Sequence, residues 1–292
     1  MKELIILIGP PGSGKSTFCS LSRKYQDFLR ISQDDMGRDG HREAFKDAIS
    51  KGMNVIVDRM DFNKQQRRDY ILAAKKEGYK ITAYTFFFSH ATCLDRMMQR
   101  MDHPTIKTKE SALAALHTFY SKFEYASLEE GFDELKEFRE HPTLGKTAVI
   151  VDIDGTVANL DHRLHYVKGE KKDWRTFLSK CDQDLPKHDI YMIAEAFCDV
   201  TGSHLVFCSG RGQEYQDKTK TWLAMNKMDY DNLFMRQERD YRQDNIIKEQ
   251  ILDFEILTRY TEVLAVFDDR DQVVKMWRDR GLTCLQVAPG DF

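Results

Sequence analysis

Residues 9–17, with the sequence Gly-Pro-Pro-Gly-Ser-Gly-Lys-Ser-Thr, restrict the fold of this chain more than any other stretch. They follow the apolar run Leu4–Ile8, which is typical of a buried parallel strand. They precede the segment Phe18–Lys24, which can form a helix. A strand, the spacing G-x-x-x-x-G-K-S and a helix, in that order, are the context of a phosphate-binding P-loop. The sequence therefore predicts an α/β fold that opens with a phosphate site.

The residue types of this loop explain how it would bind a nucleoside triphosphate. Glycines let backbone N–H groups turn inward around phosphate oxygens, and the N-terminus of the following helix adds a partial positive charge. Lys15 can reach the outer phosphates and act in catalysis, and the Ser16 hydroxyl can hold Mg²⁺. The residues predicted to bind the nucleotide are Gly9, Gly12, Ser13, Gly14, Lys15, Ser16 and Thr17. The flanking strand and helix argue against the alternative, a glycine-rich turn with a chance lysine.

The order of apolar and polar segments predicts two domains. At 292 residues the chain is long for one domain. The first part alternates strands and helices, a polar stretch with Pro142 and Gly145 follows, and the alternation then restarts. We predict domains at 1–142 and 146–292, and we expect each to be an α/β fold with a parallel sheet covered by helices.

Hydrophobic periodicity gives the expected elements. Strands are expected at Leu4–Ile8, Phe28–Ile31, Asn54–Val57, Lys80–Phe88, Ala148–Val151, Leu205–Cys208, Leu233–Met235, Leu264–Phe267 and Cys284–Val287. Helices are expected at Lys15–Lys24, Arg42–Lys51, Lys64–Glu77, Ala91–Met101, Ser111–Ala126, Ile190–Val200, Thr219–Asn226, Asn245–Leu257 and Val273–Arg280.

Composition and charge argue against several classes of protein. The net charge is −3, so any contact with nucleic acid must come from a local basic surface. No apolar run approaches the roughly 20 residues of a membrane helix, and the chain goes straight into a strand, so we expect neither a membrane span nor a signal peptide. The six cysteines are scattered, which favours free thiols in a reducing cytoplasm over a disulfide framework or a zinc site.

Acidic residues follow the second and third predicted strands. In an open parallel sheet, ligands bind at the carboxyl ends of the strands. Asp34 or Asp35 could therefore take a proton from an attacking hydroxyl, and Asp58 could hold Mg²⁺ through water or fix the acceptor. Each aspartate alone is equally typical of a loop cap.

A pair of arginines is expected on one helix face. Arg96 and Arg100 are four residues apart and precede the segment Met101–Pro104. Arginines at such a connection can close over a phosphoryl group during its transfer. A solvated helix face is the alternative.

The second half carries a different phosphoryl-transfer signature. The apolar run Ala148–Val151 ends in Asp152, and Asp154, Gly155 and Thr156 follow. This D-x-D-G-T pattern resembles that of the haloacid-dehalogenase phosphatases. Asp152 can attack phosphorus and form an aspartyl-phosphate, and Asp154 can protonate the leaving oxygen and later activate water. Mg²⁺ is needed because two carboxylates and a phosphate dianion repel one another.

Three later motifs complete the pattern in order. Ser209 ends a strand with a hydroxyl that can bind phosphate, Lys248 can neutralise the intermediate, and Asp268 and Asp269 end another strand with an acidic pair. Any one of these could be chance, and Lys248 alone is more typical of a solvent-facing helix residue. Their order and their places at strand ends favour function. The predicted metal ligands of this half are Asp152, Asp154, Asp268 and Asp269.

The first half resembles the 5′-hydroxyl polynucleotide kinase family. The resemblance implies that Asp34 is the general base and that Arg38 binds the 3′ phosphate of the acceptor. It implies that Asp58 positions the acceptor nucleotide and that Arg96 and Arg100 form a lid on the donor phosphates. The motifs that carry it are the P-loop, Asp34, Asp58 with Phe62-Asn63 and Arg67, the arginine pair and Leu128–Phe132.

Two positions depart from the family pattern. The spacing from Asp34 to Arg38 is one residue longer than in the phage pattern, which weakens the assignment of Arg38. Arg59 stands where asparagine is more usual, which leaves the local contacts to the acceptor open.

The second half resembles the phosphatase domain of the phage-type bifunctional polynucleotide 5′-kinase/3′-phosphatase. Segments 152–163, 236–248 and 268–292 carry the resemblance. It implies that the phosphatase site includes Arg163, Arg211, Arg236, Asp244 and Asp269. The resemblance is weakest over residues 160–187, where a longer basic insertion predicts either a small cap or a solvated loop. We expect the loop.

The combined resemblance implies a bifunctional enzyme that repairs nucleic-acid ends. It would transfer the γ-phosphate of ATP to 5′-hydroxyl ends of RNA or DNA and hydrolyse 3′-phosphate ends, with Mg²⁺ as cofactor. Whether 2′,3′-cyclic ends are opened, and which nucleic acid is preferred, stay open. Expected partners are nucleic-acid ends, a polynucleotide ligase that uses the products and, as in phage relatives, further copies of the chain. The expected location is the cytoplasm, that of the host if the source is viral.

Two other hypotheses remain from the sequence. A small-molecule kinase fused to a haloacid-dehalogenase small-molecule phosphatase would carry the same folds, because both folds serve many substrates. A nucleotide-sensing scaffold would bind without turnover, although every expected catalytic acid is present.

Overall fold

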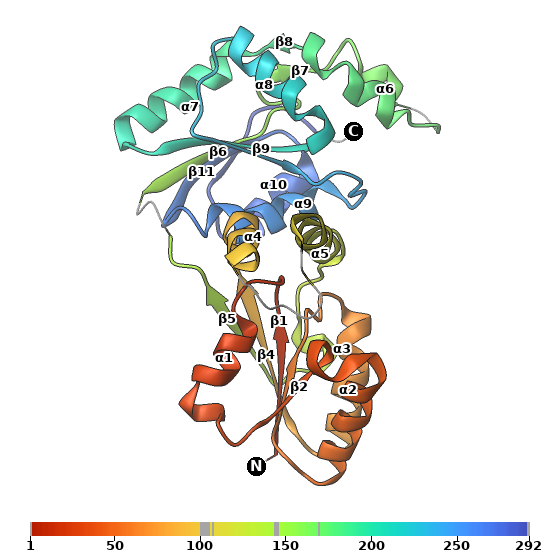
Figure 1. The fold of residues 1–292 in the computed structure, drawn as a ribbon. Helices are drawn as coiled ribbons and strands as arrows, with labels where there is room; N and C mark the ends of the chain where they lie inside the picture. The colour runs from red at the N-terminus through yellow and green to blue at the C-terminus, as the bar shows by residue number, and fades with distance from the viewer. Residues whose placement is uncertain (1, 100–105, 107, 143–145, 169, 291–292) are drawn as a thin grey trace. The chain divides into compact units, whose positions relative to one another are not determined.

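The computed structural model describes residues 2–99, 106, 108–142, 146–168 and 170–290 (Figure 1). The chain forms two compact units, Met1–Glu140 and His141–Phe292. Each unit is built on a five-stranded parallel sheet with helices on both faces, which confirms the predicted fold class.

The sheet of the first unit has the strand order β2-β3-β1-β4-β5. Its strands are β1 (Glu3–Ile8), β2 (Leu29–Ser32), β3 (Val55–Asp58), β4 (Lys80–Phe87) and β5 (Glu134–Arg139). Residues 4–8 of β1 are completely buried, as the apolar run predicted. The edge strand β5 was not predicted, because its charged residues mask the alternation and its only apolar side chains, Leu135 and Phe138, are exposed.

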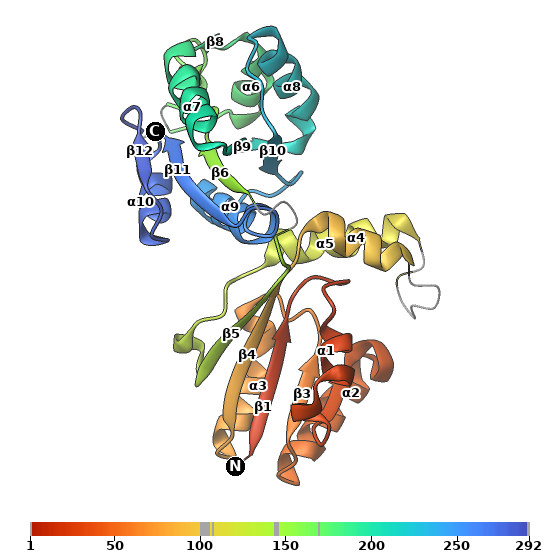
Figure 2. The ribbon, with the colours of Figure 1, turned by 90° about the vertical axis from the view of Figure 1, so that its left-hand side faces the viewer.

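Helices cover both faces of this sheet. Helix α1 (Lys15–Leu21) lies on one face, and α2 (Gln33–Ser50) and α3 (Lys64–Lys76) lie on the other (Figures 1 and 2). Helices α4 (His90–Gln99) and α5 (Lys109–Lys122) follow β4. Helix α2 begins well before the predicted Arg42, because the Ser32 hydroxyl caps it by accepting a hydrogen bond from Asp35 N at 3.3 Å. A break at Gly37, with φ of 74°, then separates a short first turn from the rest of α2.

The sheet of the second unit has the strand order β10-β9-β6-β11-β12. Its strands are β6 (Thr147–Val151), β9 (His204–Gly212), β10 (Asn232–Arg236), β11 (Glu262–Asp268) and β12 (Cys284–Gln286). The predicted strands are all present here, and β9 is longer than predicted. Its extra residues, from Ser209 to Gly212, include two that were predicted for the active site.

Two separate apolar clusters cover the faces of this second sheet. One contains side chains from α7 (His188–Thr201) and α8 (Gln216–Met225). The other contains side chains from α9 (Asp244–Ile251), the π-helical turn Leu252–Ile256 and α10 (Asp271–Asp279). The single helix that was predicted over Asn245–Leu257 is therefore an α-helix that ends in a π-helical turn.

The insertion after β6 is folded, so the expected solvated loop is wrong. Strands β7 (Ala158–Asn159) and β8 (Leu185–Pro186) pair antiparallel, and α6 (Trp174–Ser179) lies between them in the chain. Leu160, Val167 and Phe177 are buried together in a small apolar cluster of their own. We call residues 158–186 the cap. Three partly buried side chains, Leu164, Tyr166 and Leu178, pack against this cluster.

Among the described residues, no helix combines the length and apolar character that crossing a membrane requires. All six cysteines are free, as their spacing predicted.

Candidate active sites

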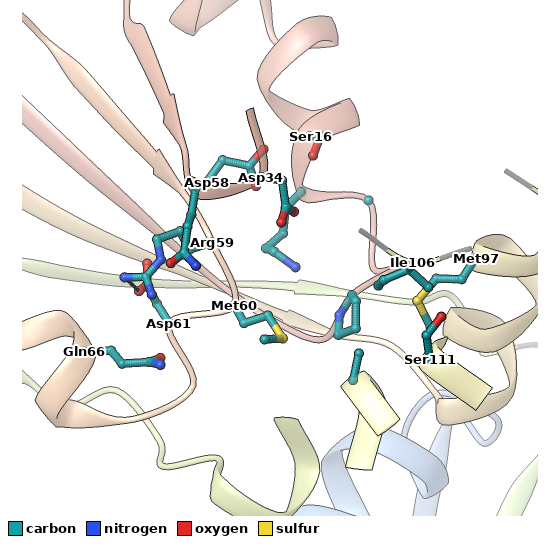
Figure 3. Close-up of a pocket in the computed structure, with 16 residues that line it drawn as sticks. Ser16, Asp34, Asp58, Arg59, Met60, Asp61, Gln66, Met97, Ile106 and Ser111 are labelled. Atoms are coloured by element: carbon teal, nitrogen blue, oxygen red, sulfur yellow. Dashed lines mark ion pairs between the residues drawn. The ribbon is translucent and has the colours of Figure 1, made fainter. Parts of the chain in front are cut away.

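The first unit has a cavity of about 420 Å³ at the carboxyl ends of β1 and β3 (Figure 3). Gly12, Gly14, Lys15 and Ser16 of the P-loop line it, together with residues from the start of α2, the loop after β3 and helices α4 and α5. The predicted nucleotide-binding loop and the predicted acidic residues therefore face one space.

The P-loop backbone has the conformation that a phosphate cradle needs. Gly12 and Gly14 have φ of 84° and 93°, and a side chain at Gly12 would collide with the carbonyl of Cys93. Lys15 is buried, and its Nζ donates to the carbonyl oxygens of Gly9 and Pro10 at 2.8 Å each. Burial lowers the pKa of Lys15, and nearby carboxylates, first that of Asp58, oppose this effect. Among the remaining loop residues, Ser13 is buried beside Lys15, and Ser16 and Thr17 are exposed at the start of α1.

The two acids left open after β2 take different environments. Asp34 is exposed and lines the cavity. Asp35 forms an ion pair with Arg30 at 2.7 Å, and Arg30 also binds the buried Asp58 at 2.7 Å. This arrangement favours Asp34 over Asp35 as the base. Arg38 is exposed in α2 and does not line the cavity, so the structure does not bring it to Asp34 and Asp58.

Of the two predicted lid arginines, Arg96 can be placed. It lies on α4 with its guanidinium 4.7 Å from the centre of the Phe88 ring. Its Nη1 is 3.9 Å from the position that a Cβ at Gly14 would take, so the guanidinium lies close to the P-loop. Arg100 lies outside the described residues.

The second unit gathers three buried carboxylates at the carboxyl ends of its central strands. Asp152 follows β6, and Asp268 and Asp269 lie at the end of β11. One oxygen of each lies within 4.8 Å of the others. Lys248 of α9, itself buried, donates to Asp152 at 2.6 Å and to Asp268 at 2.8 Å. The structure thus places Lys248 in the site rather than in solvent.

The electrostatics of this group fit a divalent cation. Burial raises the pKa of Asp152, Lys248 opposes the rise, and the charges of Asp268 and Asp269 add to it. Burial and the charge of Asp268 raise the pKa of Asp269 to about 7. Three carboxylates that repel one another at this distance form the hard oxygen site that Mg²⁺ prefers. The backbone after Asp154 lies so close to Asp269 that a side chain at Gly155, where φ is 90°, would collide with the Asp269 carboxylate.

The carboxylate of Asp154 lies outside this group of three. It accepts hydrogen bonds from Arg163 Nη2 at 2.5 Å and Arg211 Nη2 at 2.6 Å. The buried Asp184 binds the same two arginines at 2.6 and 2.9 Å. Burial would raise the pKa of Asp154, but the charges of Arg211 and Arg163 outweigh it and hold the pKa below its ordinary value. Sequence reasoning missed Asp184, which lies at the end of the cap where the resemblance is weakest.

The other predicted residues of this half lie in the same network. Ser209 is completely buried, and its hydroxyl accepts a hydrogen bond from Arg211 N at 3.2 Å. Arg236 Nη2 lies 3.3 Å from Asp244, and Asp244 lies 3.8 Å from Lys248. Every residue that was predicted for this half is therefore linked by polar contacts to the carboxylate group or to Asp154.

The fold and the two sites define a class of protein: an α/β chain that joins a P-loop unit to a unit with the aspartate site of the haloacid-dehalogenase type. Residues 146–292 match the family model described as the polynucleotide kinase PNKP phosphatase domain, which covers half of the chain. The chain belongs to this family. The resemblance inferred from the motifs of the second half is confirmed.

Individual proteins show similarity to the whole chain or to part of it. A protein of Autographa californica nuclear polyhedrosis virus, named as a candidate bifunctional polynucleotide kinase/RNA ligase, is 26% identical over 95% of this chain and 41% of its own length. The bifunctional polynucleotide phosphatase/kinase of Schizosaccharomyces pombe is 26% identical over 47% of this chain and 33% of its own length. The matched segments thus span less than half the length of either relative. A chain of the solved structure titled "Structure of Pnkp1/Rnl/Hen1 complex" is 28% identical, with a TM-score of 0.44, over 100% of this chain and 98% of that chain.

Proposed function

We propose that this chain is a bifunctional end-healing enzyme for nucleic acids. The first unit transfers the γ-phosphate of ATP to 5′-hydroxyl ends, and the second hydrolyses 3′-phosphate ends. The observation that carries the proposal is a second unit of the polynucleotide phosphatase family with its acids, lysine and arginines assembled, in one chain with a P-loop cavity. Both products are what a ligase requires.

In the first unit, Asp34 acts as the base. It removes the proton of the 5′-hydroxyl, whose oxygen attacks the γ-phosphorus, and the bond from phosphorus to the bridging oxygen of ADP breaks. Lys15 and the P-loop N–H groups stabilise the charge on the phosphate oxygens, and Arg96 adds to this from α4. Bound Mg²⁺, held by Ser16, would neutralise further phosphate charge.

In the second unit, Asp152 attacks the 3′-phosphate. A bond forms between its carboxylate oxygen and phosphorus, and the bond to the 3′-oxygen breaks as Asp154 supplies a proton. The incoming phosphate dianion raises the pKa of Asp154 by repulsion, which opposes the two arginines and lets the carboxyl carry that proton. A water oxygen then attacks phosphorus as Asp154 takes a proton from the water, and the bond from phosphorus to the Asp152 oxygen breaks, which releases inorganic phosphate and restores the carboxylate. Asp152, Asp268 and Asp269 would hold Mg²⁺, which offsets the repulsion between the carboxylates and the phosphate.

The cap supports a polynucleotide substrate rather than a small molecule. Trp174 is 40% exposed on α6, and its ring centre lies 5.7 Å from that of Phe177. Phe177 in turn lies 4.1 Å from the guanidinium of Arg163, which binds Asp154. Exposed cations accompany this aromatic side chain: Lys168, Lys171, Lys172 and Arg175. An exposed aromatic ring among cations is the surface on which single-stranded nucleic acid stacks.

The proposal extends to partners and location. The name of the viral relative joins a polynucleotide kinase to an RNA ligase in one protein. We propose that the products of this chain pass to such a ligase. We also propose that the reactions take place in the cytoplasm, that of the host if the source is viral, since ATP and nucleic-acid ends are found inside cells. Self-association stays a prediction.

One experiment tests the proposed function. The chain is incubated with ATP, Mg²⁺ and an oligonucleotide that has a 5′-hydroxyl and a 3′-phosphate, and both ends are followed. We expect a 5′-phosphate and a 3′-hydroxyl in the product. Failure to turn over ATP with any such strand would favour the sensing scaffold. Preferential action on small phosphoesters, with no competition from oligonucleotides, would favour the small-molecule enzyme.

A further inference from the structure

The loop that follows β3 is fixed through its backbone. The carbonyl of Met60 accepts a hydrogen bond from Gly9 N of the P-loop at 3.2 Å. The carbonyl of Asp61 accepts one from the buried Arg67 at 2.9 Å, and Phe62 N donates to Gln66 Oε1 at 3.1 Å. The loop is therefore held between the P-loop and α3 without help from the side chain of Asp61.

That side chain is costly to the fold in two ways. Asp61 has φ of 40°, a left-handed conformation that only a few per cent of residues other than glycine adopt. Its side chain is 1% exposed, and neither carboxylate oxygen has a hydrogen-bond partner. The nearest cation is Arg59, whose Nη1 lies 3.4 Å away and donates its hydrogen bond to the Tyr70 hydroxyl instead. Burial raises the pKa of Asp61 to about 7, as expected for a carboxylate without adequate partners.

Asp61 lines the cavity. Figure 3 shows it beside Arg59 and Gln66 at one end of the lining, away from Met97 and Ser111 at the other. A buried carboxylate accepts hydrogen bonds and repels phosphate oxygens, so a nucleotide would pair with it through a neutral donor and not through its phosphate. The substrates of the proposed kinase offer such donors on the sugar and on the base, as hydroxyl and exocyclic amino groups.

We propose that Asp61 binds the acceptor strand by accepting a hydrogen bond from the 2′-hydroxyl or from an exocyclic amino group of the base of its first nucleotide. The inference rests on the proposed kinase function and adds a subsite beside Asp58. It also gives the first unit a means of choosing among 5′-hydroxyl ends, because a site with an unpaired buried acceptor rejects a nucleotide that lacks the matching donor. Ribose offers the donor through its 2′-hydroxyl, and adenine offers it through its amino group.

The test compares wild type with Asp61→Asn on four 5′-hydroxyl strands. The first nucleotide carries ribose or deoxyribose, each with adenine or uracil. Asparagine tolerates the left-handed conformation, so the backbone is kept. The matched control is Asp69→Asn, which makes the same change at an exposed position of α3 in the same unit. KM for the strand, KM for ATP, kcat and 3′-phosphatase activity are measured for each protein.

We expect Asp61→Asn to raise KM roughly ten- to a hundredfold for strands that carry the matching donor. A rise for both ribose strands identifies the 2′-hydroxyl, and a rise for both adenine strands identifies the amino group. KM for ATP and phosphatase activity stay unchanged, and Asp69→Asn behaves as wild type.

An equal effect on all four strands, no effect on any, or a rise in KM for ATP overturns the inference. Wild type that phosphorylates none of the four strands overturns the proposed kinase function and the inference with it.

Discussion

The two units place their candidate sites at the same edge of similar sheets but build them from different groups. The first unit presents mainly backbone N–H groups of a glycine-rich loop, one lysine and an exposed acid, Asp34. The second buries a network of charged side chains around Asp152 and Asp154. A site made of backbone depends on loop conformation, whereas a site of buried charges depends on every charge having its partner. Substitutions in the first site can therefore lower activity without lowering stability, whereas substitutions in the second site should lower both.

The largest expected effect separates the two units by activity. Lys15→Ala should lower kinase activity by about a thousandfold or more, because the phosphate charge loses its main cation, and should spare the phosphatase. Asp152→Asn should remove the nucleophile of the phosphatase and spare the kinase. End-labelled oligonucleotides measure both activities in each variant. Loss of both activities from either change, with the fold intact, would contradict two independent sites.

The next prediction concerns the stability of the second unit. Lys248→Met leaves Asp152 and Asp268 buried without their cation, which should cost about 3–5 kcal/mol of unfolding free energy. Urea unfolding followed by tryptophan fluorescence measures it, because Trp174, Trp222 and Trp277 all lie in this unit.

The control for this change is Lys275→Met, which removes an exposed lysine of α10 that pairs with Asp279. It should cost less than about 1 kcal/mol. Equal losses in the two variants would show that Lys248 contributes no more than a surface charge.

A smaller effect tests the contact between the cap and nucleic acid. Trp174→Ala should raise KM for 3′-phosphate oligonucleotides about tenfold, because a base loses its stacking partner. KM for a 3′-mononucleotide should not change, since it does not reach beyond the site. The matched control is Phe197→Ala, at an aromatic position of α7 in the same unit that is 39% exposed. A rise in KM for both substrates would instead indicate that Trp174 acts by holding Arg163 in place.

The smallest expected effect is the pH dependence of the first unit. The raised pKa of Asp61, about 7, means that the folded state binds its proton more tightly than the unfolded state does. The buried charge of Asp61 therefore costs the fold nothing below the ordinary pKa of an aspartate, and its cost grows as pH rises from there and is complete above about 7. The difference in Tm between Asp61→Asn and wild type should therefore shift by a few degrees in favour of the variant from pH 5.5 to pH 8.5. Calorimetry measures the Tm of both proteins at each pH. Tryptophan fluorescence reports the unfolding of the second unit and serves as an internal control. A difference in Tm that stays constant with pH would contradict a buried Asp61 that titrates.

Most of the candidate sites followed from residues at strand ends. Asp152, Ser209 and Asp268 were predicted because each ends an apolar run, and parallel strands bring such ends together. Asp184 could not be predicted, since its role depends on how the cap folds to bring it to Arg163 and Arg211. Asp61 could not be predicted either, because what distinguishes it is a backbone torsion and the lack of hydrogen-bond partners. Both properties arise only in the folded chain.

The most direct test of two independent sites is complementation by mixing. Lys15→Ala and Asp152→Asn are incubated together with ATP, Mg²⁺ and a strand that has a 5′-hydroxyl and a 3′-phosphate. The two-site account predicts that every strand gains a 5′-phosphate and loses its 3′-phosphate, because each variant performs one reaction and releases its product to the other. Strands that stay unchanged at one or both ends in the mixture, while wild type converts both, would contradict it.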